Sequence, residues 1–280
     1  MLTIDRASDV VRLHFRSRRS TAVGYSVSAF LTDGILIDTG FPDVAGDVAR
    51  ALDELRPRAA AITHWHEDHG GNAELLARRG IPLAASAETL ATLRTLPPTG
   101  LYRRLVWGRH EPLRTPVTAA DLGPLRLVAT PGHSADHHVV WDPERERVFA
   151  GDLFLGVKVR ALHRSEDPRA HAVSVRRVAG LRPRTMFDAH RGPIPDPVPA
   201  LLAKADWLDE TIAAIERLIR AGWSDRAIGR EVLGRENAIT VITLGDLSRR
   251  NFVRAIRTGA DNEVVSAQSS VDGDATMWYA

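Results

Sequence analysis

The sequence predicts an α/β fold that continues into a small helical extension. Short apolar segments at residues 35–38 and 59–63 alternate with segments of helical periodicity at residues 44–55 and 73–79. Such alternation of strands and helices along a chain is typical of layered α/β folds. A cluster of prolines at residues 193–199 ends this regime, and helical periodicity alone follows it.

The length of 280 residues suits one large domain with a small appendage. We expect a main domain over residues 1–200, a helical extension over residues 201–260 and a disordered tail over residues 261–280, which is polar and aperiodic. The helical patterns of the extension lie at residues 201–221, 224–233 and 246–257.

The composition excludes several kinds of chemistry. The chain has no cysteine, so it has no disulfide, no thiolate metal ligand and no cysteine nucleophile. The formal net charge is only +2, and the high pI of about 9.4 reflects basic residues that are almost all arginine. A concentrated basic face is therefore not indicated, and a small-molecule substrate is favoured over a nucleic acid.

The N-terminus and the rest of the chain also lack membrane signals. Charged residues begin at Asp5 and Arg6, without the apolar core of a signal peptide. No stretch approaches the roughly 18 to 20 apolar residues that a membrane span needs. We therefore expect a cytoplasmic protein without a membrane segment.

The first elements are predicted as a meander of strands. Residues 10–15 and 22–31 alternate apolar and polar positions, and residues 35–38 form a short buried strand. Asp33-Gly34 between the last two segments is a hairpin signal. The third strand ends at Asp38, which places a carboxylate at its C-terminal tip.

The middle of the chain is less regular. Residues 87–96 have helical spacing, whereas residues 101–107 show no clear periodicity. We interpret residues 87–122 as an insertion over a functional site, because such loops commonly carry substrate contacts. Apolar segments then resume as the predicted strands 125–130, 138–141, 147–150 and 185–189.

The candidate site is built around His64, His66, Asp68 and His69, which directly follow the predicted strand at residues 59–63. Imidazole and carboxylate are ligands that zinc and similar cations prefer. Strand residues two apart point the same way, so His64 and His66 can meet one metal ion. The glycines that follow permit the turn that aims Asp68 and His69 at a second position.

Further candidate ligands stand near the ends of later predicted strands. They are His133 in Pro-Gly-His-Ser, Asp152 in Gly-Asp and His190 in Ala-His-Arg-Gly. With Thr-His-Trp-His-Glu-Asp-His-Gly-Gly-Asn at residues 63–72, their order and contexts resemble the metallo-β-lactamase superfamily over roughly residues 10–200. The chain resembles the glyoxalase II-like and β-lactamase-like hydrolases of this superfamily, and its helical extension is similar to that of the β-lactamase-like hydrolases.

The resemblance implies an αββα sandwich of two mixed β-sheets flanked by helices, with the site along one edge. It implies one metal ion on His64, His66 and His133, and a second on Asp68, His69 and His190, with Asp152 between them. By the same pattern, Asp38 stands behind a ligand histidine and orients it. The residues that bind substrate are not identified by this pattern.

The chemistry of such a site agrees with this reading. Two divalent ions can share a hydroxide of lowered pKa and polarise an ester-type carbonyl. We predict a hydrolase in which a metal-bridging hydroxide attacks a thioester, a lactone or another carboxylic ester, with Asp68 as the catalytic residue that orients it. A phosphodiester suits the same chemistry. Zn²⁺ is the favoured metal, with Mn²⁺ and Fe as alternatives.

Two alternative functions stay open. Persulfide dioxygenases share the His-x-His-x-Asp-His pattern but use one iron, and small nucleases of the superfamily cleave RNA. Against two ester-cleaving branches, the segment after Asp152 lacks the cysteine motif of glyoxalase II, and Leu155 stands near the tyrosine of acyl-homoserine lactonases. The extension is expected to shape the pocket or to form a homodimer contact.

Overall fold

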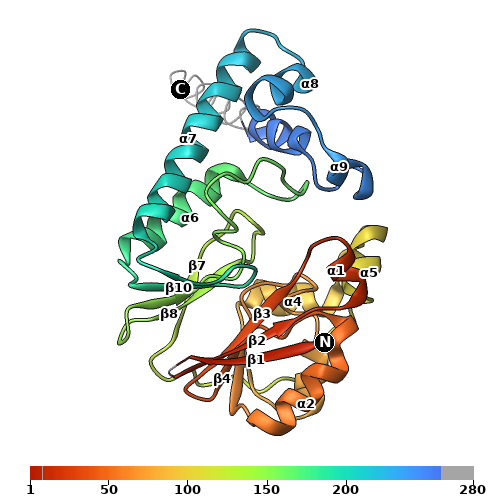
Figure 1. The fold of residues 1–280 in the computed structure, drawn as a ribbon, viewed down its shortest axis with the longest axis vertical. Helices are drawn as coiled ribbons and strands as arrows, with labels where there is room; N and C mark the ends of the chain where they lie inside the picture. Colours follow the sequence, from red (N-terminus) through yellow and green to blue (C-terminus); the bar gives the residue numbers. More distant parts are fainter. Residues whose placement is uncertain (8, 260–280) are drawn as a thin grey trace, which may run out of the picture.

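The computed structural model describes residues 1–7 and 9–259 and contains two mixed β-sheets (Figure 1). The predicted tail at residues 261–280 lies outside the described residues. The first sheet has the order β1-β2-β3-β4-β5-β6. Its strands are β1 (Leu2–Ala7), β2 (Val10–Phe15), β3 (Val27–Thr32), β4 (Ile35–Ile37), β5 (Ala59–Ala61) and β6 (Leu83–Ala84).

The first sheet changes from antiparallel to parallel pairing at β4. Strands β1 to β4 pair with antiparallel neighbours, whereas β4, β5 and β6 run parallel, with Ile37 opposite Ala61. The hairpin predicted at Asp33-Gly34 joins β3 to β4. Both of its residues have positive φ (49° and 74°), as the type I′ turn favoured in two-residue hairpins requires.

The second sheet has the order β11-β10-β9-β8-β7. Its strands are β7 (Arg126–Ala129), β8 (His138–Asp142), β9 (Arg147–Phe149), β10 (Thr185–Asp188) and β11 (Gly192–Pro195). Strands β9 and β10 pair in parallel, while the other neighbours are antiparallel. Helix α6 (Pro168–Gly180) makes the crossover that the parallel pair needs.

The two sheets face one another, and helices cover their outer faces. Phe30 of β3 and Phe149 of β9 pack together in the layer between the sheets, with ring centroids 5.7 Å apart. On the first sheet lie η1 (Pro42–Val44), α2 (Ala45–Leu55), α3 (Ala73–Arg78) and α4 (Ala87–Thr95). On the second lie α6 and the start of α7 (Val198–Arg220). The expected αββα sandwich is confirmed.

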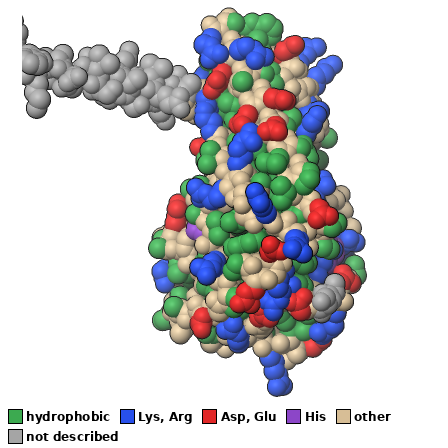
Figure 2. All heavy atoms as spheres, turned by 90° about the vertical axis from the view of Figure 1, so that its left-hand side faces the viewer, with side chains coloured by type: hydrophobic (Ala, Val, Ile, Leu, Met, Phe, Trp, Pro, Cys, Tyr) green, Lys and Arg blue, Asp and Glu red, His purple; other side chains and the backbone are tan. Residues whose placement is uncertain are grey.

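The C-terminal helices gather around the second half of α7 (Figure 1). They comprise α8 (Asp225–Ile228), the π-helical turn η2 (Gly229–Leu233), α9 (Ala238–Ile242) and a helix at residues 249–259. Figure 2 shows this extension as a narrower body above the sandwich. Helix α7 contributes Leu201 to the sandwich core and Ile215 to the extension core, and the predicted boundary at residue 200 stays a prediction.

The structure differs from the sequence analysis at three places. Residues 22–31 are not one strand, because Ser17 and Ser20 cap a short helix, α1 (Arg18–Ala22), through reciprocal hydrogen bonds. Residues 101–107, which lack clear periodicity, form helix α5 (Leu101–Trp107), whose buried side chains include Trp107. Helix α6 was not predicted, although Asp167 and Pro168 form a typical N-terminus for it.

Within the described ranges 1–7 and 9–259, every helix is too short or too polar to span a bilayer.

Candidate metal centre

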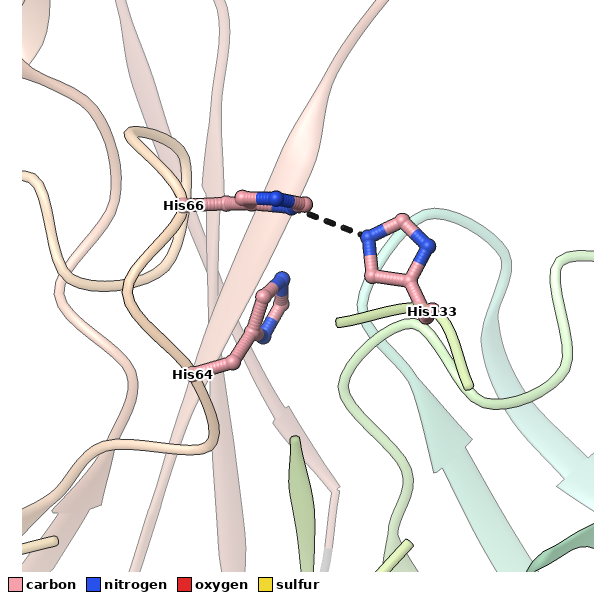
Figure 3. A group of neighbouring side chains, drawn as sticks. All are labelled: His64, His66 and His133. Atoms are coloured by element: carbon pink, nitrogen blue, oxygen red, sulfur yellow. Dashed lines mark hydrogen bonds between the residues drawn. The ribbon is translucent and has the colours of Figure 1, made fainter. Parts of the chain in front are cut away.

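The first group of candidate ligands consists of His64, His66 and His133, all buried. His64 and His66 lie in the loop after β5, and His133 lies between β7 and β8, so the two sheets contribute one part each. One ring nitrogen of each lies within 4.8 Å of the others (Figure 3). The structure therefore brings together the three histidines that the resemblance assigns to one ion.

The ring nitrogens of this group suit a cation. Nδ1 of His66 lies 2.9 Å from Nε2 of His133. Nδ1 of His64 contacts Thr63 Oγ1 at 3.0 Å, which leaves the buried Nε2 of His64 without a hydrogen-bond partner among the described residues. A buried acceptor without a partner is costly, and a cation would satisfy it.

The second group consists of Asp68, His69, Asp152 and His190. Oδ1 of Asp152 lies 3.1 Å from Nε2 of both His69 and His190. Its other oxygen, Oδ2, lies 3.3 Å from Nε2 of His133 in the first group. One carboxylate thus contacts both groups, which is the arrangement expected of a ligand between two ions.

Groups behind the candidate ligands hold the rings in orientation. Asp38 Oδ2 lies 2.7 Å from His69 Nδ1, and the backbone oxygen of Ser26 lies 2.7 Å from His190 Nδ1. Glu166 Oε2 lies 3.5 Å from His133 Nδ1. In each case the contact is made by Nδ1, which leaves Nε2 for the site and selects one tautomer.

The sequence identified only Asp38 among these supporting groups. Glu166 lies in the charged loop after Asp152, without a motif of its own. His137, given no ligand role from sequence, accepts a hydrogen bond from the backbone N–H of Asp152 at 3.1 Å. Such partners are recognisable only when the fold brings them next to a ligand.

Two motif residues have backbone surroundings that few residue types can occupy. Asp38 has φ of +62°, a left-handed conformation that Asp and Asn tolerate better than most residues. Its carboxylate also accepts hydrogen bonds from the N–H and Oγ1 of Thr63. A Cβ at Gly71 would lie 1.9 Å from the backbone oxygen of Glu67, so only glycine fits where the loop closes on itself.

Burial and charge give the candidate ligand histidines two kinds of environment, and His133 of the first group resembles the second group because Glu166 and Asp152 outweigh burial and raise its pKa. Burial lowers the pKa of His64 and His66 well below the ordinary range, which keeps them neutral and suited to metal binding. Burial also acts on His190, but Asp152 and Asp68 outweigh it and raise its pKa to about 9. The neighbouring carboxylates likewise outweigh burial at His69 and raise its pKa.

A cavity of about 280 Å³ opens onto the candidate ligands. Its walls come from α5 through Tyr102, from the loop after Asp152 through His163, and from the C-terminal extension through Leu247. Nδ1 of His163 lies 3.4 Å from Asp246 Oδ2 and 3.5 Å from the Tyr102 hydroxyl. The predicted insertion and the extension therefore meet above the site.

Helix α5 is fixed to the histidine motif by a buried ion pair. Nε of Arg103 donates to Glu67 Oε2 at 3.0 Å, and its guanidinium lies 5.6 Å from the ring centroid of Trp65. Both partners are within the loop that carries His64 and His66. Arg103 thus anchors the insertion, whereas the neighbouring Arg104 is exposed and does not line the cavity.

The chain is similar in sequence to several known proteins. A sequence profile described as Metallo-beta-lactamase superfamily matches residues 23–190. A Beta-lactamase-like protein 2 homolog from Caenorhabditis elegans is 30% identical over 175 residues, 59% of this chain and 54% of that protein. Thioesterase pkgB from Emericella nidulans is 31% identical over 162 residues, 56% of this chain and 42% of that protein. The chain spans about half the length of the curated relatives it matches.

Solved structures share the fold. A metallo-beta-lactamase family protein from Thermus thermophilus aligns with a TM-score of 0.64 at 18% identity, covering 91% of this chain and 95% of that one. The metallo-beta-lactamase FIM-1 from Pseudomonas aeruginosa, in its mono-zinc form, aligns with a TM-score of 0.58 at 20% identity, covering 75% of this chain and 95% of that one.

Proposed function

We propose, since the chain belongs to the metallo-beta-lactamase superfamily, that it is a hydrolase that uses two divalent metal ions to cleave an ester-type bond. The observation that carries this proposal is the position of Asp152, whose two carboxylate oxygens lie 3.1 Å from His69 and His190 and 3.3 Å from His133. A carboxylate shared between two sets of ligands supports two ions rather than one.

The donor set fits such ions. His64, His66 and His133 would hold one ion, Asp68, His69 and His190 the other, and Asp152 would contact both. Imidazole nitrogen and carboxylate oxygen suit zinc, which we propose as the metal. The buried Nε2 of His64 fits this role, because among the described residues it has no hydrogen-bond partner and a cation would satisfy its lone pair.

The residues around the ions would orient the attacking water and enclose the substrate. When bound, a pair of divalent ions lowers the pKa of a water and polarises the carbonyl that it attacks. Asp68, whose Oδ2 lies 3.4 Å from His190 Nε2, would orient that water. Tyr102, His163 and Leu247 wall the cavity and limit the access of bulk solvent to the reacting bond.

A thioester is the substrate class that we favour, with lactones and other carboxylic esters as related candidates. The support is the name of one relative, Thioesterase pkgB. The cavity combines aromatic walls from Tyr25 and Trp107 with the polar ligands, which suits an acyl group next to a hydrolysable bond.

Metal analysis and turnover together test this function. We expect about two zinc ions per chain and hydrolysis of thioesters, and we expect His66→Ala to reduce kcat/KM by about a thousandfold or more and to lower the metal content. His14→Ala is the matched control, because His14 does not line the cavity. Its Nδ1 lies 3.1 Å from the hydroxyl of Ser28. One iron per chain, with oxygen consumed on a persulfide, would overturn the proposal.

A further inference from the structure

A cleft of about 690 Å³ lies in the C-terminal extension, away from the candidate ligands. Six of the fourteen residues that line it are arginines. They come from the loop after Asp152, from the α8–η2 region and from the helix at residues 249–259: Arg164, Arg226, Arg230, Arg235, Arg250 and Arg254. Side chains of Lys and Arg also lie along the narrow upper body in Figure 2.

The two carboxylates of the cleft are already engaged within the extension. Asp225 accepts a hydrogen bond from Arg257 Nε at 2.8 Å, outside the lining. Glu236 accepts from the backbone N–H groups of Arg249 and Arg250 at 3.2 and 3.0 Å.

Among the described residues, only Arg254 of these six arginines lies within ion-pair distance of a carboxylate, with its Nε 4.0 Å from Asp225 Oδ2. Among the residues that the structure describes, the guanidinium groups of Arg226, Arg230 and Arg250 have no carboxylate within ion-pair distance. All three side chains are exposed to the cleft and the solvent. The cleft therefore keeps a positive potential that a ligand anion can use.

The cleft and the metal cavity share a wall. The backbones of Leu162 and Ser248 pair as an isolated bridge, with both N–H···O distances at 3.1 Å. His163 and Leu247 line the metal cavity, whereas Arg164 and Ser248, the next residues along, line the arginine cleft. A ligand long enough to cross this wall would reach both sites.

We propose, on the premise of the thioesterase function above, that the arginine cleft anchors the phosphate groups of a phosphorylated thioester substrate. Arginine recognises phosphate through paired N–H donors in a fixed fork, so a cleft lined by several arginines suits phosphate groups. A cleft of about 690 Å³ is the size of a small-molecule site. A nucleic acid instead needs an extended basic track, and the chain carries a net charge of only +2.

Two thioesters with the same acyl group test the proposal. A coenzyme A thioester carries phosphates, and the N-acetylcysteamine thioester has the same reacting end without them. In the double variant Arg230→Gln/Arg250→Gln, we expect KM for the coenzyme A thioester to rise at least about tenfold, the change that the loss of even one charge-assisted contact would cause. KM for the N-acetylcysteamine thioester should stay within about twofold, since it never reaches the cleft.

Arg217→Gln/Arg220→Gln is the matched control, because both arginines lie on α7 outside the cleft. Calorimetric titration with pyrophosphate gives a readout independent of turnover, and it should weaken in the cleft variant alone. Equal changes in KM for both thioesters, or unchanged pyrophosphate binding, would overturn the anchor. The proposal would also be wrong if the arginines were needed to bind a single-stranded oligonucleotide while the cleft variant affected the two thioesters equally.

The outcomes also separate this proposal from the proposed function. If the wild-type protein hydrolyses neither thioester, the thioesterase function fails, and pyrophosphate binding still decides whether the cleft holds phosphate. If both thioesters are hydrolysed with metal dependence but the cleft variant behaves as the control does, the function stands and the anchor is wrong.

Discussion

Asp38 is the residue on which the orientation of His69 depends. Its carboxylate contacts His69 Nδ1 at 2.7 Å and Thr63 at 2.9 Å, and it does so from a left-handed backbone conformation at the end of β4. The neutral His64 and His66 and the carboxylate-paired His69 and His190 form two different environments within one cluster. The chemistry of single residues thus depends on neighbours from other strands.

Replacement of Asp38 by asparagine tests this dependence. Asn accepts the same φ, so the fold should persist, but a neutral amide holds the His69 ring less firmly, and zinc affinity should fall about 10- to 100-fold. Asp196→Asn is the control, because Asp196 also has positive φ (45°) but is exposed and follows the end of β11. Competition with a zinc chelator measures the affinity; equal affinities in the two variants would contradict this role.

At the scale of elements, α7 is tied to the loop that follows Asp152. Lys204 is 1% exposed and donates from Nζ to the backbone oxygens of Phe154 at 2.6 Å and Gly156 at 3.3 Å. Burial lowers the pKa of Lys204 from 10.5 to about 8, despite the opposing carboxylates of Glu166 and Asp188. The helix therefore positions the loop through a charge that is costly to bury.

This cost predicts a pH dependence of stability. Between pH 8 and 10.5 the unfolded lysine keeps its proton while the folded one releases it, so the unfolding free energy must rise with pH. Relative to Lys204→Met, which cannot titrate, the wild type should gain about 3 kcal/mol over this interval. Urea unfolding of both proteins at a series of pH values measures the difference; parallel profiles would show that Lys204 does not carry the effect.

At the scale of the whole molecule, α7 joins two cores. Leu201 and Ala205 pack in the sandwich, and Ile212 and Ile215 pack with Phe252 in the extension. The extension in turn places Leu247 and Asp246 at the metal cavity. We therefore expect the sandwich and the extension to unfold together, because neither core can be dismantled without uncovering the shared helix.

Phe252→Ala tests this coupling. The side chain is fully buried, so its removal should lower the unfolding free energy by about 3–5 kcal/mol and shift one transition seen by all probes. The control is Val241→Ala, because the side chain of Val241 is 75% exposed. This substitution should change the unfolding free energy by less than about 0.5 kcal/mol. Separate transitions for near- and far-ultraviolet circular dichroism would show that the extension unfolds independently.

The sequence by itself indicated a layered α/β fold and the candidate metal-binding residues, whereas the two-sheet sandwich and the division of those residues between two ions came from the resemblance to a known family. Alternating strands and helices predict the layers, and His64, His66, Asp68 and His69 are close enough in the chain for local backbone geometry to aim them. His133, Asp152 and His190 follow apolar strands, so their place at a sheet edge follows from the strand pattern. These patterns involve residues close together in the chain, so they can be recognised without the tertiary structure.

Only the tertiary structure decided what surrounds that site. Helix α5 is held at the site by the contact of Arg103 with Glu67, and Glu166 lies next to His133 because the loop after Asp152 folds back. The wall between the cavity and the arginine cleft joins Leu162 to Ser248, which are far apart in the chain. These contacts depend on burial and charge pairing between distant segments, so the spacing of residues along the chain does not predict them.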